Sequence, residues 1–439
     1  MKKWLWLALF GCGVANADML DALRAYEQKN YTEAQQQFAE LLPLGNELAA
    51  FNLGVMAYQG EGQVQNLPTA LAYFMFAAHH KHAQAESLVS KIKAASSPQQ
   101  LTQAEATFKK LQQAVLVKDV VLETEFTSEK PSPIRRYAPE YPKEAARQGV
   151  FGYVTLRFLV DEEGKVTAID TLDAYPEKVF NKSSIKAVKR WQYQATGSKH
   201  LMDVRLDYSL SNGGINVSAL EKITLDNNLW RYALAGAPQY QFVLGTLLSL
   251  MEIQSQNGFW FDPDLPLSAE PDFTIYKNRA HLTADLDGFW GYAVVRVDKE
   301  GIITEELRTI FEPKNQLTSL LGLKLEGQVE AEVYRIYKHS TVSRSKLRIV
   351  PSIPTSRSMS GRFWWEQAAK NGNLDAQRVM AAYDKQWEQY LVNQQDAEVM
   401  AWTGTRLILE GQREQGMQLL DQAIAQNYQP AKEMKQQFM

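Results

Sequence analysis

The spacing of apolar residues changes along this chain of 439 residues, and the change limits the possible folds more than any other feature. From residue 20 to 118, apolar side chains recur at helical spacing, with glycine or proline at the turns. Between 153 and 160, Val154, Leu156, Phe158 and Val160 occupy every second position, which is typical of a strand with one face on a core. Helical spacing returns near the end of the chain. The sequence therefore predicts an α+β protein in which helices flank a strand-rich centre.

We divide the chain at these shifts, because each hydrophobic period belongs to a different kind of structure. The predicted segments, in order, are a leader at 1–17, helical repeats at 18–118, a strand-rich domain at 119–212, a helical segment at 213–272, a small β-rich domain or insert at 273–355, and helical repeats at 356–439. Hydrophobic residues make up 45% of the chain and charged residues 22%, close to the average of globular proteins. A chain of this length and composition can form several hydrophobic cores.

The first 17 residues have the pattern of a secretory signal peptide. Lys2 and Lys3 precede an apolar run at 4–14, and Ala15 and Ala17 provide a small-x-small cleavage site. The apolar run is well below the roughly 20 residues that a membrane-spanning helix needs. We therefore expect cleavage before residue 18 and a periplasmic mature protein without a membrane span.

Cys12 is the only cysteine of the chain, so cleavage of the leader would leave none. Disulfides and thiolate metal sites are then excluded from the mature protein. An alternative is a lipoprotein anchored at Cys12, because residues 9–12 (Leu-Phe-Gly-Cys) are similar to the bacterial lipobox. The formal net charge is −3 and no block of lysine and arginine interrupts it, so a nucleic-acid partner is not expected.

Small and aromatic residues follow a repeat-like order between 49 and 85. The ordered residues are Leu53, Gly54, Tyr58, Gly60, Gly62, Ala70, Tyr73, Phe74, Ala77 and Ala78. They resemble a Sel1-like repeat, and the preceding residues around Tyr26 and Tyr31 resemble a tetratricopeptide-type (TPR-like) unit. Gly54 and the alanines would let the paired helices approach closely. Gly60 and Gly62 would allow positive φ in the connecting loop.

The same pattern returns near the end of the chain. Residues 363–377 look like the second helix of a Sel1-like unit and its link to the next unit. We place the first helix of that unit far upstream, at 240–245, with a different domain inserted between them. A further helical pair is expected at 397–437. Stacked helical pairs form extended scaffolds that usually bind other proteins.

The strand-rich domain has a definite predicted order. A strand at 153–160 and a second at 165–170 form a hairpin across the turn Asp-Glu-Glu-Gly at 161–164. A helix follows at 183–193 and a third strand at 204–210. Farther along the chain, strand-like runs occur at 292–297 and 331–337.

Motif residues of this domain fall in a characteristic sequence order. They comprise a Tyr-Pro pair, two glycines, a hairpin glycine and a helix ending in Trp-x-Tyr. Together they resemble the TonB C-terminal domain over about 133–210. The motif residues, which we expect to be mainly structural, are Tyr141, Pro142, Gly149, Gly152, Gly164, Trp191 and Tyr193.

The last strand of this domain is the candidate binding site. A three-stranded sheet leaves N–H and C=O groups unpaired along an edge strand. The resemblance implies that this edge accepts an extended peptide of an outer-membrane TonB-dependent transporter by strand addition. The residues assigned to the peptide-binding edge are Val204, Arg205, Leu206, Asp207, Tyr208, Ser209 and Leu210.

Two differences from the TonB family bear on this expectation. Ala138 stands where members that couple to transporters commonly carry glutamine. Energy-transducing members also have an uncleaved membrane helix and a proline-rich spacer, neither of which we recognise in this sequence. We therefore expect a binding or accessory role in TonB-dependent transport rather than force transmission by this chain alone.

The sequence contains none of the GxSxG, HExxH and GxxxxGK motifs of common enzymes and nucleotide sites. His79, His80 and His82 form the densest histidine cluster, but side chains at this spacing cannot all face one metal ion. We therefore predict a non-enzymatic protein without metal or cofactor. One alternative is a helical-repeat scaffold for cell-envelope complexes without transport coupling. Another is an enzyme that hydrolyses envelope glycan, which would need converging carboxylates that the sequence does not place.

Overall fold

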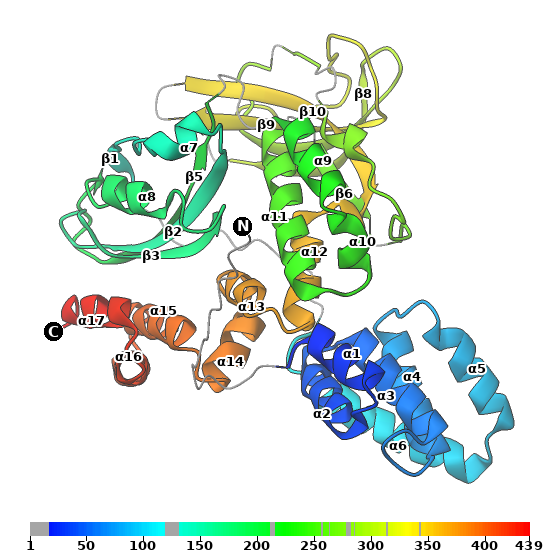
Figure 1. Ribbon diagram of the computed structural model, residues 1–439. Coiled ribbons are helices and arrows are strands. Elements are labelled where there is room, and N and C mark those ends of the chain that lie inside the picture. Colours follow the sequence, from blue (N-terminus) through cyan, green and yellow to red (C-terminus); the bar gives the residue numbers. More distant parts are fainter. Residues whose placement is uncertain are drawn as a thin grey trace. The chain divides into compact units, whose positions relative to one another are not determined.

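The computed structural model describes residues 17–118, 131–210, 216–255, 258–262, 264–277, 282–284, 286–312, 315–341 and 344–439 (Figure 1). The expected signal peptide, apart from Ala17, and the lipoprotein alternative at Cys12 lie outside these residues. The chain divides into two compact units. The first consists of Met1–Glu123, Gly236–Pro238 and Ala368–Gln377, and the second of Thr124–Ala235, Gln239–Gln367 and Arg378–Met439.

The first unit is helical. Its main helices are α1 (Met19–Glu27), α2 (Tyr31–Leu41), α3 (Glu47–Gln59), α4 (Leu67–His79), α5 (Ala85–Ala95) and α6 (Pro98–Gln113). Neighbouring helices form pairs, α1 with α2 and α3 with α4. Side chains at the helix starts satisfy free backbone N–H groups, as where Asn46 accepts a 2.7 Å hydrogen bond from Ala49.

The α3–α4 pair has the close approach that its small residues predict. A methyl group added at Gly54 would lie 2.8 Å from the ring of Phe74. Gly60 and Gly62 in the connecting loop have φ of 76° and 69°, which confirms the expected positive φ. Lys81, which follows α4, also adopts a positive φ of 67°.

The three clustered histidines pack against aromatic rings. His82 stacks on Phe51 with 4.1 Å between ring centroids, and burial lowers its pKa. Among the described residues, no group of three or more histidine, cysteine, aspartate or glutamate side chains is placed to hold a metal ion. Across the same residues, no helix combines the length and the apolar character that crossing a membrane requires.

The second unit begins with the strand-rich domain, which we call the first module. Its elements are β1 (Pro133–Arg135), α7 (Lys143–Arg147), β2 (Gly152–Val160), β3 (Val166–Tyr175), α8 (Asn181–Val188), β4 (Gln192–Tyr193) and β5 (His200–Tyr208). The strands form a sheet in the order β3-β2-β5, and β1 pairs separately with β4. Both neighbours of β2 run antiparallel to it. α7 and α8 cover one face of this sheet (Figure 1).

The predicted helix at 183–193 is wrong at its end, because α8 stops at Val188. The chain turns there, and Gln192 and Tyr193 pair with β1 as a short strand. Trp191 is therefore outside the helix. Its indole N–H donates a 2.8 Å hydrogen bond to the carbonyl oxygen of Tyr137.

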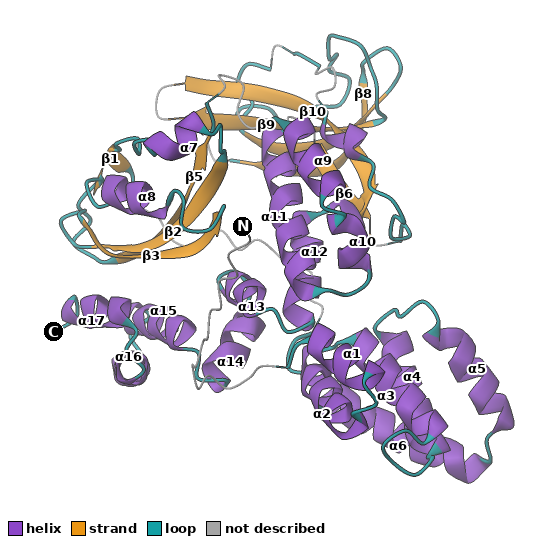
Figure 2. Cartoon of the chain, viewed as in Figure 1, coloured by secondary structure: helices purple, strands orange, loops and turns teal. Residues whose placement is uncertain are grey.

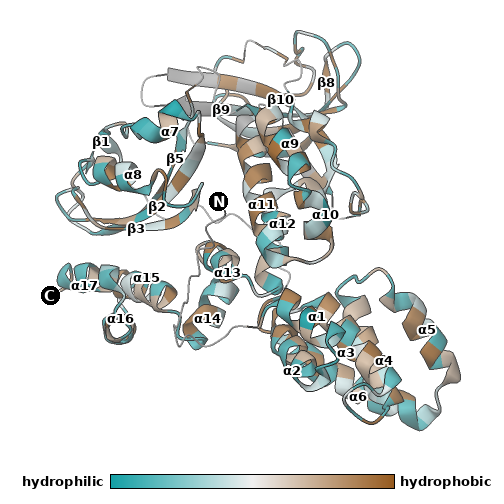
Figure 3. Ribbon diagram, viewed as in Figure 1, coloured by the Kyte–Doolittle hydropathy of each residue, from teal (hydrophilic) through white to brown (hydrophobic). Residues whose placement is uncertain are grey.

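A helical segment follows the first module and contains α9 (Val217–Asp226), α10 (Leu229–Leu234) and α11 (Pro238–Gln254). Much of α11 is apolar (Figure 3), and Leu244, Leu247 and Met251 are fully buried. The prediction of a helical segment at 213–272 is wrong at its end, because residues 258–262 form the strand β6 (Gly258–Asp262).

The second sheet has five strands. After β6 come β7 (Gly291–Val297), β8 (Ile303–Phe311), β9 (Val333–Thr341) and β10 (Arg344–Ser356). Their spatial order is β6-β10-β9-β7-β8. Figure 2 draws the strands of the chain in orange. β7 and β9 contain most of the two strand-like runs predicted at 292–297 and 331–337. β6 pairs parallel to β10, and the other neighbours are antiparallel.

Helix α12 (Gly361–Lys370) returns to α11 after this sheet. A methyl group at Gly245 would come within 2.7 Å of the Gly361 carbonyl oxygen, so the two helices touch through their glycines. The two helices expected to pair are therefore in contact, while the inserted domain between them stays a prediction. The remaining helices are α13 (Leu374–Ala381), α14 (Lys385–Asn393), α15 (Ala397–Leu409), α16 (Arg413–Ala425) and α17 (Gln429–Gln436). α15 and α16 approach in the same way, at Gly404 and Gly416.

Candidate functional site

The strand β5 lies at one edge of the first sheet. It pairs with β2 along its whole length, from Gly152 opposite Tyr208 to Val160 opposite His200. Within the described part of the chain, no strand pairs with the other side of β5, which we call the outer edge. In an antiparallel strand, alternate residues direct both their N–H and C=O groups away from the neighbouring strand. The outer edge therefore presents regularly spaced donors and acceptors.

The predicted edge residues fall partly inside this strand. Residues 204–208 belong to β5, whereas Ser209 and Leu210 follow its end. The predicted strand at 204–210 begins too late, because β5 starts at His200. Leu201 and Met202 are two apolar residues in a row, so apolar and polar residues do not alternate strictly at the start of the strand. Only the structure shows that these residues pair with β2.

The two faces of β5 have different surroundings. Met202 and Tyr208 belong to the core beneath α7 and α8, and Val204 and Leu206 pack against that core. The opposite face carries Asp203, Arg205 and Asp207, as the strand alternation requires. Side chains of a paired peptide would alternate in the same way, between an apolar face and a charged one.

Aromatic contacts hold the end of β5 in place. Tyr208 stacks on Phe180 with 4.1 Å between ring centroids, and its hydroxyl lies 2.6 Å from Ser184 Oγ. Tyr141 packs edge-on against both rings and donates its hydroxyl to the Val150 carbonyl oxygen. Pro142 precedes α7 and accepts the Ala146 N–H at 2.9 Å. These contacts of Tyr141 and Tyr208 fix the end of β5 against α8, and Pro142 contributes to the first turn of α7.

Two motif glycines mark close backbone contacts. A methyl group at Gly152 would lie 1.7 Å from the Tyr175 carbonyl oxygen, and one at Gly164 would lie 2.1 Å from that of Tyr193. Gly164 also has φ of 82°. Gly149 has φ of 64°, but no atom lies within 4 Å of an added methyl group. Gly149 is therefore required by its backbone conformation alone.

Arg205 is the central charged residue of β5. Its guanidinium lies over the ring of Tyr153 at 3.7 Å, and its Nε is 3.0 Å from an Asp207 carboxylate oxygen. Its Nη1 lies 3.4 Å from Ser249 Oγ on α11. Nη2 is buried and has no hydrogen-bond partner among the described residues. Tyr153 in turn donates its hydroxyl to Asp173, and burial together with that carboxylate raises its pKa.

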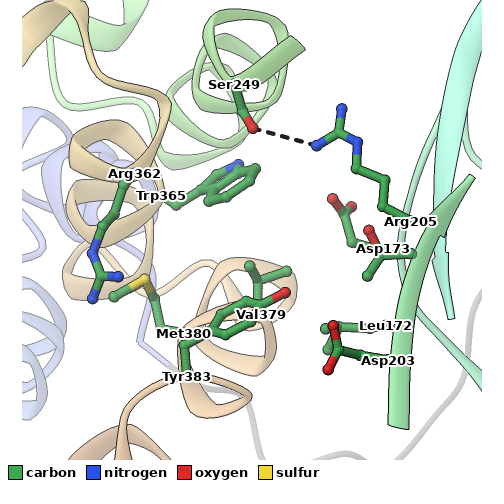
Figure 4. A pocket seen from close by; sticks show the side chains of 11 residues that line it. Leu172, Asp173, Asp203, Arg205, Ser249, Arg362, Trp365, Val379, Met380 and Tyr383 are labelled. Atoms are coloured by element: carbon green, nitrogen blue, oxygen red, sulfur yellow. Dashed lines mark hydrogen bonds between the residues drawn. The ribbon is translucent and has the colours of Figure 1, made fainter. Parts of the chain in front are cut away.

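A cavity of about 300 Å³ adjoins this charged face. β2, β3 and β5 supply one wall, including Asp173, Asp203 and Arg205, while α11 and α12 supply Ser249 and Trp365 on the other. Figure 4 shows Arg205 reaching from the sheet toward Ser249 across the top of this space. The cavity thus begins beside the candidate edge and combines charged with aromatic walls.

The face of the sheet opposite α7 and α8 is also buried, contrary to the expectation of one core-facing side. Tyr153 belongs to the core around α10 and α11, and Leu159 to the core around α15 and α16. Arg157 lies between them, with its guanidinium 4.4 Å from the Trp402 ring centroid and 3.5 Å from Glu398. Burial lowers the pKa of Arg157. The sequence does not indicate this covered face, because a charged residue such as Arg157 in a strand usually marks exposure to water.

Glu252 lies on α11 and accepts the Gly361 N–H at 2.6 Å. Burial raises its pKa from 4.5 to about 7, against the opposing effects of that hydrogen bond and of Arg205. Between these two pH values the folded chain holds a proton that the unfolded chain has lost. The contribution of this group to the free energy of unfolding therefore falls as the pH rises.

Glu252→Gln is expected to raise the free energy of unfolding at pH 8 by up to about 3 kcal/mol, and to change it little at pH 5. Glutamine keeps an oxygen for the Gly361 N–H and cannot ionise. Urea unfolding at both pH values measures this difference. The exposed Glu177, changed to glutamine, is the matched control. An equal effect of Glu252→Gln at both pH values would contradict the assignment.

Residues 137–210 match the family described as Gram-negative bacterial TonB protein C-terminal. The matched segment contains every predicted motif and edge residue. TonB of Yersinia enterocolitica is 32% identical over 73 residues, which cover 17% of this chain and 29% of that protein. TonB of Escherichia coli K12 is 31% identical over 64 residues, covering 15% and 27%. The chain thus spans less than a third of the length of these relatives.

Two solved structures are also similar to part of this chain. The solution structure of the Pseudomonas aeruginosa TonB C-terminal domain is 21% identical, with 20% of this chain and 93% of that chain covered and a TM-score of 0.18. The TonB2 protein of Vibrio anguillarum is 28% identical, with 22% and 96% covered and a TM-score of 0.17. The assignment of the helical pairs to Sel1-like and TPR-like repeats stays a prediction.

Proposed function

We propose that this chain is a non-enzymatic, periplasmic binding protein of TonB-dependent transport that holds extended peptide segments of outer-membrane transporters along β5. The observation that carries the proposal is the outer edge of β5, which lies inside the segment matching the TonB C-terminal domain. Strand addition would satisfy the backbone groups along this edge.

The other edge of the sheet is a poorer candidate. β3 forms that edge, but it contacts α8 on one side of the sheet and α17 on the other. Asn181 of α8 also bonds to Thr171 of β3 at 3.3 Å. β3 is thus packed by helices on both faces, and the resemblance to the TonB C-terminal domain implies a ligand edge at the last strand, so β5 is the favoured edge.

The expected affinity is modest. Each backbone hydrogen bond contributes a net of about 0.5–1.5 kcal/mol, so four or five bonds hold a peptide reversibly. Specificity would come from side chains beside the edge. Arg205 and Asp207 already form an ion pair, so a charged peptide residue must compete with that pair.

A helical-repeat scaffold without transport coupling is the second candidate function. It is favoured by three helix pairs that touch through small residues, at Gly54, at Gly245 with Gly361, and at Gly404 with Gly416. Such pairs commonly form protein-binding surfaces. In this case the helices would bind the partners, and β5 would contribute no affinity.

Site-directed disulfide cross-linking distinguishes the two functions. In a Cys12→Ser background, Asp207→Cys places a thiol on β5, and Glu177→Cys places one on an exposed turn of the same module. The probe is a TonB-dependent transporter with one cysteine in its extended periplasmic segment. We expect at least about tenfold more cross-linking at Asp207→Cys than at Glu177→Cys, because a peptide paired with β5 raises the effective concentration of its cysteine beside residue 207 and not beside residue 177.

Two adjacent proline variants provide the control for backbone pairing. Because N–H directions alternate along β5, only one of Leu206→Pro and Asp207→Pro removes an outward N–H, while the other removes a bond to β2. The variant that removes an outward N–H should no longer capture the transporter, and its melting temperature should stay unchanged. Capture that persists in every variant with an intact fold would reject binding at this edge.

A further inference from the structure

The second sheet repeats the strand arrangement of the first module. In the first module β2 lies between β3 and β5, and in the second sheet β7 lies between β8 and β9. Each central strand continues through a tight turn into its first neighbour and pairs with a later strand on its other side. All four pairings are antiparallel. The second sheet therefore contains the same three-stranded topology.

The two hairpin turns are built alike. Asp161 Oδ1 accepts from the N–H groups of Glu163 and Lys165 at 3.1 and 2.7 Å. Asp298 Oδ1 accepts from Glu300 and Ile302 at 3.0 and 2.8 Å. The turn glycines, Gly164 and Gly301, have φ of 82° and 85°. Each residue of the second turn lies 137 positions after its counterpart.

The segment after each hairpin closes on the turn in the same way. Tyr193 donates its N–H to the Gly164 carbonyl oxygen at 2.8 Å, and Leu325 donates to that of Gly301 at 2.7 Å. Lys165 bridges to Gln192, and Ile302 to Lys324. These later counterparts lie 132 positions apart, because the connection in the second sheet is shorter and its described residues between β8 and Lys324 form no helix corresponding to α8.

The buried faces agree under this correspondence. Phe158 and Val160 of β2 correspond to Val295 and Val297 of β7, and each pair lies in the core of its own sheet. On the third strand, Met202 corresponds to Tyr334, which is buried in the second core. Val204 corresponds to Ile336, also buried there. The two sheets share their strand order, the hydrogen bonds of the turn, the contact that closes on the turn glycine and the buried face of each strand. Two unrelated hairpins would not agree in all four features.

The third strands differ in what lies beside them. The edge of β9 that corresponds to the outer edge of β5 is occupied by β10, from Arg344 opposite Thr341 to Pro351 opposite Tyr334. Ile349 of β10 lies opposite Ile336 and is 3% exposed. Leu347, two positions earlier, packs against the same core. β10 thus buries alternate aliphatic side chains on the core face of the sheet.

We propose that β7, β8 and β9 form a second TonB-type sheet whose ligand edge is filled by the chain's own β10, and that β10 displays the kind of segment that β5 binds. That segment is extended, runs antiparallel to β5 and carries aliphatic side chains at alternate positions. The position facing Val204 corresponds to that of Ile349 and lies over Met202 and Leu206, where a charged side chain would lose its hydration. This inference rests on the proposed function and specifies its ligand.

The correspondence also fixes a register. Ile349 opposite Ile336 corresponds to a peptide residue opposite Val204. A peptide with the sequence of 345–353 would then place Lys346 opposite Asp207 and Val350 opposite Asp203. Arg348 would face Arg205, so the probe peptide carries serine at that position.

Disulfide trapping in the full chain tests this register. Two proteins, Cys12→Ser with either Asp207→Cys or Asp203→Cys, are mixed with two probe peptides that carry cysteine at the place of Lys346 or of Val350. The matched pairs, 346 with 207 and 350 with 203, should cross-link about tenfold more than the exchanged pairs, because a shifted register loses backbone bonds. A control peptide with glutamate in place of Leu347 and Ile349 should cross-link at the level of the exchanged pairs.

The outcomes separate this inference from the proposed function. Equal trapping of matched and exchanged pairs, or preference for the exchanged pairs, overturns the antiparallel register. Absence of peptide trapping, together with transporter cross-linking at Asp207→Cys, rejects the likeness of β10 to the ligand and leaves the proposed function standing. Absence of both rejects both. Circular dichroism of each cysteine variant shows that the fold is kept.

Discussion

Replacing Arg157 with alanine is expected to lower the free energy of unfolding of the second unit by about 3 kcal/mol at pH 8. Arg157 is a buried cation between the first sheet and α15, and Glu398 and the ring of Trp402 are its neighbours. Removing Arg157 leaves the buried Glu398 carboxylate with less positive charge nearby to offset its own. Fluorescence-detected urea unfolding of the full chain measures the loss.

The pH dependence identifies the cause of that loss. Burial, together with Asp170, raises the pKa of Glu398 to about 7, while Arg378 and Arg157 oppose the shift. At pH 6 the folded protein holds Glu398 mostly neutral, and neutral Glu398 depends less on Arg157. The loss caused by Arg157→Ala should therefore be smaller at pH 6 than at pH 8.

A double-mutant cycle supplies the control for Arg157. Arg157→Met preserves volume without charge, and Glu398→Gln removes the partner's charge. Replacing both members of a buried ion pair is often nearly neutral, whereas removing one is costly. The double variant should therefore be more stable at pH 8 than Arg157→Met alone. Additive losses would show that the two side chains do not act as a pair.

Gly152→Ala is expected to destabilise the first module by at least about 3 kcal/mol, the upper range for overpacking. The added methyl group would meet the Tyr175 carbonyl oxygen at 1.7 Å and Pro176 Cδ at 2.9 Å. Backbone atoms cannot rotate away, so the ends of β2 and β3 would have to separate. The midpoint of urea unfolding measures the effect.

Gly149→Ala is the matched control in the same motif. The φ of Gly149 is positive, unlike that of Gly152, and the space around it is empty, so only the backbone cost of about 1 kcal/mol applies. The two variants should differ by roughly 2 kcal/mol or more. Equal losses of unfolding free energy in the two variants would mean that the close contact with Tyr175 is not the reason why residue 152 is glycine.

The first module was predictable where the sequence pattern is local. Gly164 and its neighbouring aspartate determine the hairpin, and the alternation around Phe158 determines β2. The end of α8 was not predictable, because the pairing of Gln192 with β1 competes with continuation of the helix. The start of β5 was missed for a similar reason, since its register is set by β2.

The surroundings of the candidate site depend on contacts far apart in sequence. Arg205 meets Ser249, and Tyr153 lies in a core built around α11. A sequence period shows that a strand has two faces, but it does not show which distant helix covers the second face. Arg157 illustrates this limit, because a charged residue in a strand usually indicates exposure to water. Its burial follows only from the position of Glu398 and Trp402.

The contact between α11 and α12 has a consequence for the origin of the chain. Gly361 touches Gly245 and bonds to Glu252, although the entire second sheet separates these residues in sequence. An insertion whose two ends are held this close leaves the contacts of its host helices intact. A single recombination event can therefore add, exchange or remove the segment that contains the second sheet. Helices α11 and α12 keep their contacts with each other in each case.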